Sequence, residues 1–348
     1  MRVLNRIVTG AVIGAALLIP AEVIAGKSVK VQATQRAFDD AYRQGDWTRA
    51  IDLGLELVQL MPDHPIVQYN LACIYALNGD RHEALNWLSR AAASGFLQLT
   101  HLDADSDLDS VRDLPGYDSV RRAIVENHLR RRSQILEAAK SSPPLIVAPD
   151  DHDPSSPAPL VIALHGYGDY GENYPDLWGA AAGKLGAILA VPFGARVVGD
   201  GRAWGDLDET ETIVMLTLDQ VKKKFEIDRE RIVLTGFSQG GFMAMALGTK
   251  HPDIFSGVIP MAGGYIPDID QPPTANGNEP TFYFMVGSRD NNVSEVRRAA
   301  ADYKEAGYEV RLRVMAGIGH SFPRDTEREL GKALRYVLNR RLSDQNPG

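Results

Sequence analysis

A serine between glycines stands where an apolar run gives way to a helical pattern, and this arrangement limits the possible folds. Residues 232–235 read IVLT and residues 242–247 read FMAMAL, and Gly236 and Gly240 flank Ser238 between them. Small neighbours let the backbone turn sharply, so the serine hydroxyl can project from a strained strand–turn–helix junction. The pattern predicts a nucleophilic serine. A tight turn with a helix-capping serine is the alternative interpretation.

Two backbone amides near this serine are candidates for stabilising a developing negative charge. The N–H of Gln239 falls at a helix N-terminus, where amides lack partners and the dipole favours an anion. A second apolar run ends in LHGYGD at residues 164–169. Its glycines let the backbone face the serine, so we expect the N–H of Tyr167 to complete an oxyanion hole. We expect His165 to brace this loop.

Apolar runs alternate with helical patterns from residue 160 onward. The runs typical of buried strands are residues 160–164, 187–191, 257–261 and 281–286, and an alternating run at 310–314 suits an outer strand. Helical patterns lie at residues 211–225, 241–250, 294–306 and 324–340. Strands alternating with helices predict an α/β domain with a mostly parallel sheet and helices on both faces. Ligands of such sheets bind beyond the carboxyl ends of the strands, where the serine falls.

A serine nucleophile needs a base within reach and an acid to orient that base. In the chain order serine, acid, histidine, only His251 and His320 can supply the base. His251 precedes a proline at a helix end. His320 lies in the glycine-rich GIGHSF loop after the last strand, so we expect His320 to be the base. Asp290, just past the strand at 281–286, is the expected acid, with Asp268 and Asp270 as rivals in a proline-rich loop.

Composition narrows the class of protein. The chain has 348 residues, 44% of them hydrophobic and 24% charged, which is enough for about two globular domains. Its net charge of −8 and the absence of a long basic run give no indication of nucleic-acid binding. Cys73 is the single cysteine, so an intramolecular disulfide is excluded. No Cys/His cluster has zinc-ligand spacing, and we expect no metal.

The first 25 residues resemble a targeting segment. Arg2 and Arg6 precede an uncharged apolar stretch at residues 7–19, and AEVIA at residues 21–25 offers small residues for cleavage. The apolar stretch is short for a stable membrane span. We expect a signal peptide at residues 1–25 and export to the periplasm or the medium. An uncleaved membrane anchor is the alternative.

Residues 28–140 carry helical patterns with an internal repeat. Gly45 and Gly79 are 34 residues apart, as are Ala50 and Ala84, and Pro62 separates the two copies. This period and these residues resemble a tetratricopeptide repeat. The resemblance implies an all-α helical-repeat domain with a possible protein partner. Helical hairpins formed by chance are the alternative.

The segment after the repeat is expected to complete the helical domain. Residues 102–109 read LDADSDLD and lack the central glycine and terminal glutamate of a calcium loop, so a solvated helix start is expected. Residues 120–125 predict a further helix. Residues 141–159 predict a linker with a possible edge strand at 145–148. The α/β domain then occupies residues 160–342.

Four stretches together resemble the carboxylesterase/phospholipase branch of the α/β hydrolases, which includes acyl-protein thioesterases. They are residues 164–169, 236–241, 287–293 and 317–321, within a resemblance spanning residues 158–340. The resemblance implies a Ser238–Asp290–His320 triad, an oxyanion hole from the N–H groups of Tyr167 and Gln239, and no metal or organic cofactor. Residues 202–206 resemble the family's tryptophan loop, which makes Trp204 a possible pocket residue.

These features predict a serine hydrolase that cleaves carboxylic esters or thioesters through an acyl-enzyme. A peptidase or amidase on the same fold is one alternative, because a triad does not select the leaving group. A repeat-based protein-binding module with a catalytically idle hydrolase domain is another. The expected partners are an ester substrate and a protein bound by the repeats, with neither nucleic acid nor a stable membrane span.

Overall fold

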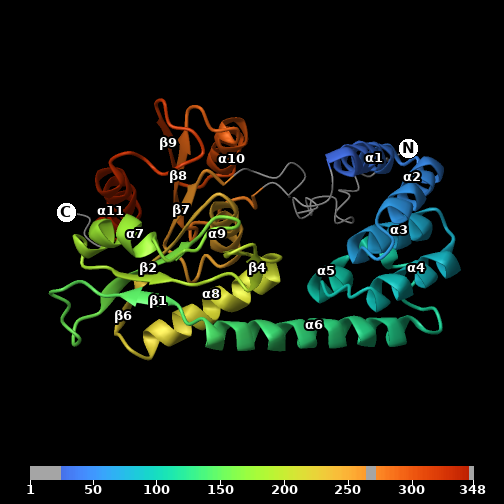
Figure 1. Ribbon diagram of the computed structural model, residues 1–348, viewed down its shortest axis with the longest axis horizontal. Coiled ribbons are helices and arrows are strands. Elements are labelled where there is room, and N and C mark those ends of the chain that lie inside the picture. Colours follow the sequence, from blue (N-terminus) through green and yellow to red (C-terminus); the bar gives the residue numbers. More distant parts are fainter. Residues whose placement is uncertain (1–24, 264–271, 345–348) are drawn as a thin grey trace. The chain divides into compact units, whose positions relative to one another are not determined.

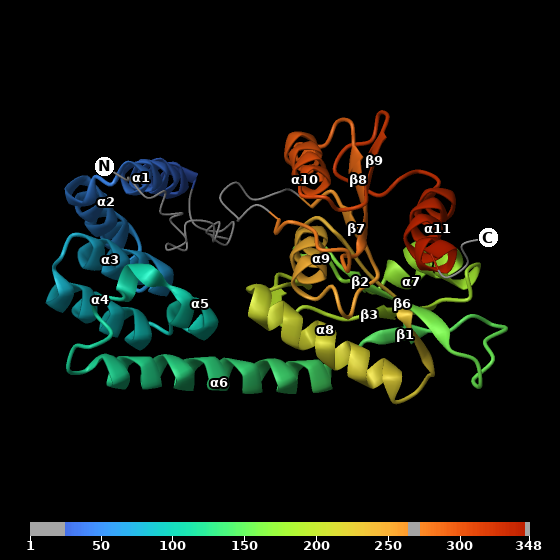
Figure 2. The ribbon, with the colours of Figure 1, turned by 180° about the vertical axis from the view of Figure 1, so that it is seen from behind.

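The computed structural model describes residues 25–263 and 272–344 (Figures 1 and 2). The chain divides into two compact units, residues 1–133 and 134–348. Apart from Ala25, the predicted signal peptide lies outside the described residues, as do Asp268 and Asp270. Across the described ranges, no helix is long and apolar enough to cross a membrane.

The first unit is built from helices. They are α1 (Ala25–Gln44), α2 (Trp47–Leu60), α3 (Pro65–Leu77), α4 (Arg81–Ala93), α5 (Leu99–Ala104), the 3-10 turn η1 (Ser106–Leu108) and α6 (Tyr117–Ser141). Helix α6 contains the predicted helix at 120–125 but is far longer. It continues past the division between the units and supplies the last residues before the second unit's first strand.

The turns of the two helical pairs share the same type of conformation at the 34-residue interval. Gly45 and Gly79 both adopt positive φ, 71° and 90°, which ends α1 and α3 without a Cβ clash. The aspartates that follow them, Asp46 and Asp80, each accept a hydrogen bond from the third residue of the next helix. The glycines therefore stop one helix, and the aspartates start the next.

The acidic segment of the first unit is partly buried, so the prediction of a solvated helix start is wrong for two of its residues. Asp105 and Asp107 are 1% and 8% exposed. Asp105 accepts a hydrogen bond from the hydroxyl of Tyr69 at 2.6 Å, and Asp107 accepts one from Tyr42 at 2.7 Å. These donors lie far upstream in the sequence, so local composition could not reveal them. Burial raises the pKa of Asp107 to about 6.

The second unit contains a seven-stranded sheet. Its strands are β1 (Leu145–Val147), β2 (Ala158–Leu164), β3 (Ile188–Val191), β6 (Ile227–Phe237), β7 (Gly257–Met261), β8 (Thr281–Gly287) and β9 (Val310–Met315). Their order is β1-β3-β2-β6-β7-β8-β9, and only the edge strand β1 is antiparallel to its neighbour. A separate hairpin joins β4 (Arg196–Val198) and β5 (Gly201–Ala203). The sequence had not predicted this hairpin.

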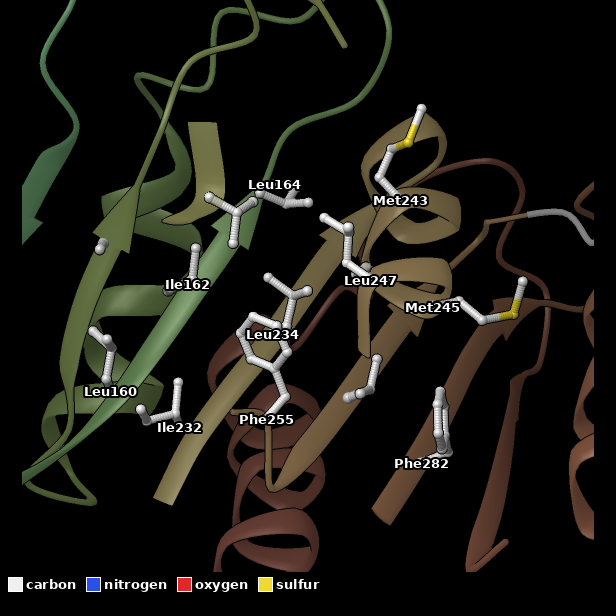
Figure 3. Packing of buried hydrophobic residues seen from close by; sticks show 14 of the residues in the cluster. Leu160, Ile162, Leu164, Ile232, Leu234, Met243, Met245, Leu247, Phe255 and Phe282 are labelled. Atoms are coloured by element: carbon white, nitrogen blue, oxygen red, sulfur yellow. The ribbon is translucent and has the colours of Figure 1, made fainter. Parts of the chain in front are cut away.

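Helices cover both faces of the sheet. They are α7 (Tyr174–Gly183), α8 (Leu207–Lys222), α9 (Gln239–Lys250), α10 (Val293–Glu305) and α11 (Thr326–Asp344). Leu160 and Ile162 pack into the core beneath α8, α9 and α10 (Figure 3), while Val161 and Ala163 enter the core beneath α7 and α11. This alternation along β2 reflects the two-residue period of a strand. The carboxyl ends of the central strands β2, β6, β7 and β8 carry the site.

Candidate active site

Ser238 sits at the sharp turn between β6 and α9. Its φ is 54°, a left-handed conformation that non-glycine residues rarely adopt. Its N–H donates to the carbonyl of Met261 at 2.8 Å, which ties the turn to the end of β7. A Cβ on Gly240 would lie 2.4 Å from the carbonyl oxygen of Leu164, so only glycine fits there. The crowded glycines allow the helix to start directly after the strand, with a half-buried serine at the turn.

The structure brings together the three predicted triad residues. The Oγ of Ser238 lies 2.8 Å from the Nε2 of His320. On the other side of the ring, Nδ1 lies 3.0 and 3.1 Å from the two carboxylate oxygens of Asp290. A carboxylate can only accept, so Nδ1 carries the proton and Nε2 is free to accept from the serine hydroxyl. His320 is 43% exposed, whereas the Asp290 side chain is buried.

The loops that carry the acid and the base are joined to each other. The N–H of Arg289 donates to the carbonyl of Ile318 at 2.8 Å, and the N–H of Gly317 donates to Ser288 Oγ at 2.9 Å. A Cβ on Gly287 would lie 2.3 Å from the carbonyl oxygen of Ile318, so the two loops touch through backbone. This contact fixes the distance between Asp290 and His320.

Two further residues contact the predicted triad, a role that their sequence motifs alone do not indicate. The N–H of Asn292 donates to Asp290 Oδ1 at 2.9 Å, and its side chain donates to the carbonyl of Ala262 at the same distance. The ring of Phe237 packs against the imidazole of His320, with centroids 4.9 Å apart. Phe237 lies in the stretch 236–241 and Asn292 in the stretch 287–293, each beside a predicted site residue. This position in the motifs is the only sequence signal for their role.

The loop that holds Tyr167 passes beside the serine. A Cβ on the preceding Gly166 would lie 3.6 Å from the Cβ of Ser238. His165 is fully buried beneath this loop; its Nδ1 bonds the carbonyl of Gly166 at 2.8 Å and its Nε2 accepts from the N–H of Gly194 at 2.9 Å. Burial lowers the pKa of His165, which favours this neutral form. The geometry suits a bracing residue.

The side chains of Gln239 and Trp204 link the two predicted halves of the oxyanion hole. Gln239 bonds the backbone of Trp204 twice, accepting from its N–H at 3.1 Å and donating to its carbonyl at 3.0 Å. The Trp204 indole N–H donates to the carbonyl of His165 at 2.7 Å. Trp204 is completely buried. The structure thus places it beneath the loop as a brace, and not on an open pocket wall as the sequence had suggested.

Other titratable groups are engaged elsewhere. His251, the other histidine that follows Ser238, pairs through Nε2 with Glu211 at 2.8 Å. Among residues 25–263 and 272–344, one group has the ligand types and proximity for a metal ion, and it consists of Cys73, Asp105 and Asp107 in the first unit. Its two carboxylates already accept hydrogen bonds from tyrosine hydroxyls.

The second unit is similar in sequence to known proteins. Residues 205–338 match the phospholipase/carboxylesterase family. Poly(3-hydroxyalkanoate) depolymerase C of Paucimonas lemoignei is 27% identical over 173 residues, 39% of this chain and 42% of its own. Feruloyl esterase C of Emericella nidulans is 29% identical over 146 residues, 40% of this chain and 50% of its own. The carboxylesterase of Bacillus cereus, a solved structure, superposes with a TM-score of 0.45 at 20% identity, covering 58% of this chain and 97% of its own.

The sheet topology and the family match together support an α/β-hydrolase fold of the esterase type for the second unit. Within that fold, residues 205–338 match the phospholipase/carboxylesterase family in particular. The chain spans about a quarter to a half of the length of the curated relatives it matches.

Proposed function

We propose that the protein is a serine hydrolase that cleaves carboxylic esters or thioesters through Ser238, His320 and Asp290. The observation that carries this proposal is the unbroken hydrogen-bond chain from Ser238 Oγ through His320 to the buried carboxylate of Asp290. The strained serine at a strand–helix turn supports it, because that geometry exposes the hydroxyl to an incoming carbonyl. The family match supports an esterase-type reaction.

In this proposal Ser238 Oγ attacks the acyl carbon while His320 Nε2 takes the hydroxyl proton. The carbonyl π pair moves onto oxygen, where the N–H groups of Tyr167 and Gln239 stabilise the negative charge. The tetrahedral intermediate collapses, the bond to the leaving group breaks, and His320 returns the proton to that group. Water then attacks the acyl-enzyme with His320 again as base, which releases the acid and free Ser238. Asp290 orients the imidazole and stabilises its charged form.

The test is hydrolysis of a series of aryl esters of increasing acyl length by wild type and by Ser238→Ala. We expect the substitution to lower kcat by about a million-fold, as loss of a triad serine does elsewhere. Ser294→Ala removes an exposed hydroxyl at the start of α10 and serves as the matched control, with turnover unchanged. Equal turnover by wild type and Ser238→Ala on esters and a thioester would refute the proposal.

The same assay separates esterase from amidase activity. Esters, thioesters and anilides with one acyl group differ only in the leaving group, and the triad itself does not select among them. We expect ester and thioester turnover to exceed anilide turnover. The reverse order would make the protein a peptidase or amidase on the same fold.

We propose that the first unit is a tetratricopeptide-type module that binds a protein partner. We also propose that a signal peptide at residues 1–25 directs export of the protein. The repeated turn geometry at a 34-residue interval supports the first proposal. The charged start and the apolar stretch of the sequence support the second. Sequencing the N-terminus of the exported protein tests cleavage, and a pull-down with Ser238→Ala tests whether partner binding is independent of catalysis.

A further inference from the structure

A hollow of about 310 Å³ lies in the second unit among two strands and the last helix. Tyr283 of β8 and Arg311 of β9 are direct neighbours in the sheet register. Helix α11 contributes Lys332, Arg335 and Tyr336, which share one helix face because they are three and four residues apart. These segments are the orange and red elements of Figure 1.

The hollow is separate from the proposed catalytic residues. Asp290 follows the carboxyl end of β8 at Gly287, whereas Tyr283 lies near the amino end of the same strand. Four residues along a strand correspond to about 13 Å. A small group bound in the hollow is therefore too far from Ser238 to react with it.

The charges that line the hollow are all positive. Arg311, Lys332 and Arg335 contribute three cations, and no carboxylate lines it. Lys332 is partly neutralised by Glu329 at 3.0 Å. Within the described residues, Arg311 and Arg335 have no carboxylate partner. Because the whole chain carries a net charge of −8, this concentration of positive charge is local to one surface.

The guanidinium group of Arg311 is held in place by aromatic rings. The guanidinium carbon of Arg311 lies 5.9 Å from the ring centroid of Tyr283 and 5.3 Å from that of Tyr336. The hydroxyl of Tyr336 donates to Glu309 at 2.6 Å, which fixes the ring and engages the nearby carboxylate. A guanidinium held by aromatic faces keeps its N–H groups available for an oxygen acceptor.

We propose that this hollow binds a phosphate monoester group. Arg311 and Arg335 donate to its terminal oxygens, and Lys332 supplies a third positive charge. A phosphate monoester carries nearly two negative charges and three strong acceptor oxygens at neutral pH, which matches several converging cations. A carboxylate has one charge and two oxygens, so it would leave part of this set unused. The phosphate can belong to a soluble ester or to a lipid headgroup.

The experiment measures binding to the full chain by calorimetry with inorganic phosphate and glycerol phosphate, and by sedimentation with phosphatidylcholine vesicles with and without phosphatidic acid. We expect saturable binding of at least one of these phosphate probes. Arg311→Gln and Arg335→Gln should each weaken it about tenfold, the usual effect of removing a charged donor. Arg313→Gln is the matched control, because Arg313 lies two residues along β9 but already pairs with Glu329 at 2.8 Å.

Binding of the soluble ester supports the proposal with a soluble phosphate ester as the source, and binding confined to phosphatidic acid vesicles supports it with a lipid headgroup as the source. Absence of saturable binding for every phosphate probe overturns it. So does unchanged affinity in Arg311→Gln, or an equal loss in Arg313→Gln. Ester turnover and thermal unfolding of Arg311→Gln, both expected at wild-type values, show that a loss of binding is not a loss of fold.

Discussion

Trp204 and Trp178 are both fully buried in the second unit, but within the described part of the chain only the Trp204 indole has a hydrogen-bond acceptor, the carbonyl of His165. Trp204→Phe removes this bond from beneath the loop that carries Tyr167. We expect kcat for ester hydrolysis to fall about tenfold with little change in KM, because a misplaced oxyanion donor weakens the transition state more than substrate binding.

Trp178→Phe is the control for the loss of an indole from the core. Its Nε1 has no partner within the described residues, so this substitution should leave kcat near the wild-type value. Steady-state kinetics and thermal unfolding of both variants check the prediction. A wild-type kcat in Trp204→Phe, or an equal loss in Trp178→Phe, would show that the bond to His165 does not position the loop.

The backbone of Ser238 stores strain that can be measured apart from its chemistry. Ser238→Ala and Ser238→Gly both remove the hydroxyl and its bond to His320, but only glycine adopts a φ of 54° without cost. We expect the glycine variant to exceed the alanine variant by about 1 kcal/mol in free energy of unfolding. Normally glycine is the less stable of the two, because it has more freedom in the unfolded chain. Denaturant unfolding of both variants measures this difference. A more stable alanine variant would mean that the backbone at residue 238 is not strained.

The secondary structure of the second unit was largely predictable because its signals are local. The runs at residues 160–164 and 257–261 became β2 and β7, since continuous apolar runs suit strands buried on both faces. The hairpin β4–β5 was not foreseen. Its strands have only three residues each, which is too short for an apolar period.

The contacts that hold the site together depend on residues distant in the sequence. The motifs around Ser238 and His320 indicate the chemistry, but not the two hydrogen bonds between the Gln239 side chain and the backbone of Trp204. These hydrogen bonds join residues 35 positions apart, and nothing in the local pattern of either residue indicates them. The sequence therefore predicts Trp204 only as a possible pocket residue, whereas the structure buries it beneath the loop.

The buried acidic turn of the first unit gives its stability a distinct pH dependence. Burial raises the pKa of Asp107 to about 6 in the folded state, above its ordinary value of 3.8. Between these pH values the unfolded chain loses the proton first, so the folded state loses stability as pH rises and the penalty is complete above pH 6. Asp107→Asn cannot ionise and can still accept from Tyr42. We expect this variant to gain stability relative to wild type at pH 7, but not at pH 4.

Asp103, in the same segment, provides a control of opposite sign. Arg121 donates two hydrogen bonds to its carboxylate and lowers its pKa, so its contribution is present at neutral pH and is lost in acid. Asp103→Asn should therefore lose stability relative to wild type at pH 7 and also at pH 4, which is above the ordinary pKa of 3.8, and should lose less only in stronger acid. Urea unfolding followed by circular dichroism across this pH range checks the pair. The same pH trend in both variants would contradict the assignment.

The two units have separate hydrophobic cores, and this separation sets how the whole chain should unfold. The cores of the first unit are drawn from residues up to Ile124, and those of the second begin at Ile135. Each unit also holds two of the four tryptophans, Trp47 and Trp87 in the first and Trp178 and Trp204 in the second. Fluorescence can therefore report on either unit once the tryptophans of the other are replaced by phenylalanine.

We expect two unfolding transitions, and Gly248→Ala should move only the one that belongs to the second unit. A Cβ at this position of α9 would lie 2.3 Å from Val258 Cγ2 in β7, and such overpacking costs about 1–3 kcal/mol. Gly179→Ala in α7 is the control, because its Cβ would meet nothing within 4 Å and should stabilise the helix by about 0.5–1 kcal/mol. Urea unfolding followed by the fluorescence of each tryptophan pair makes the comparison. A single transition that shifts equally in both probes would mean that the cores, although separate, unfold as one cooperative unit.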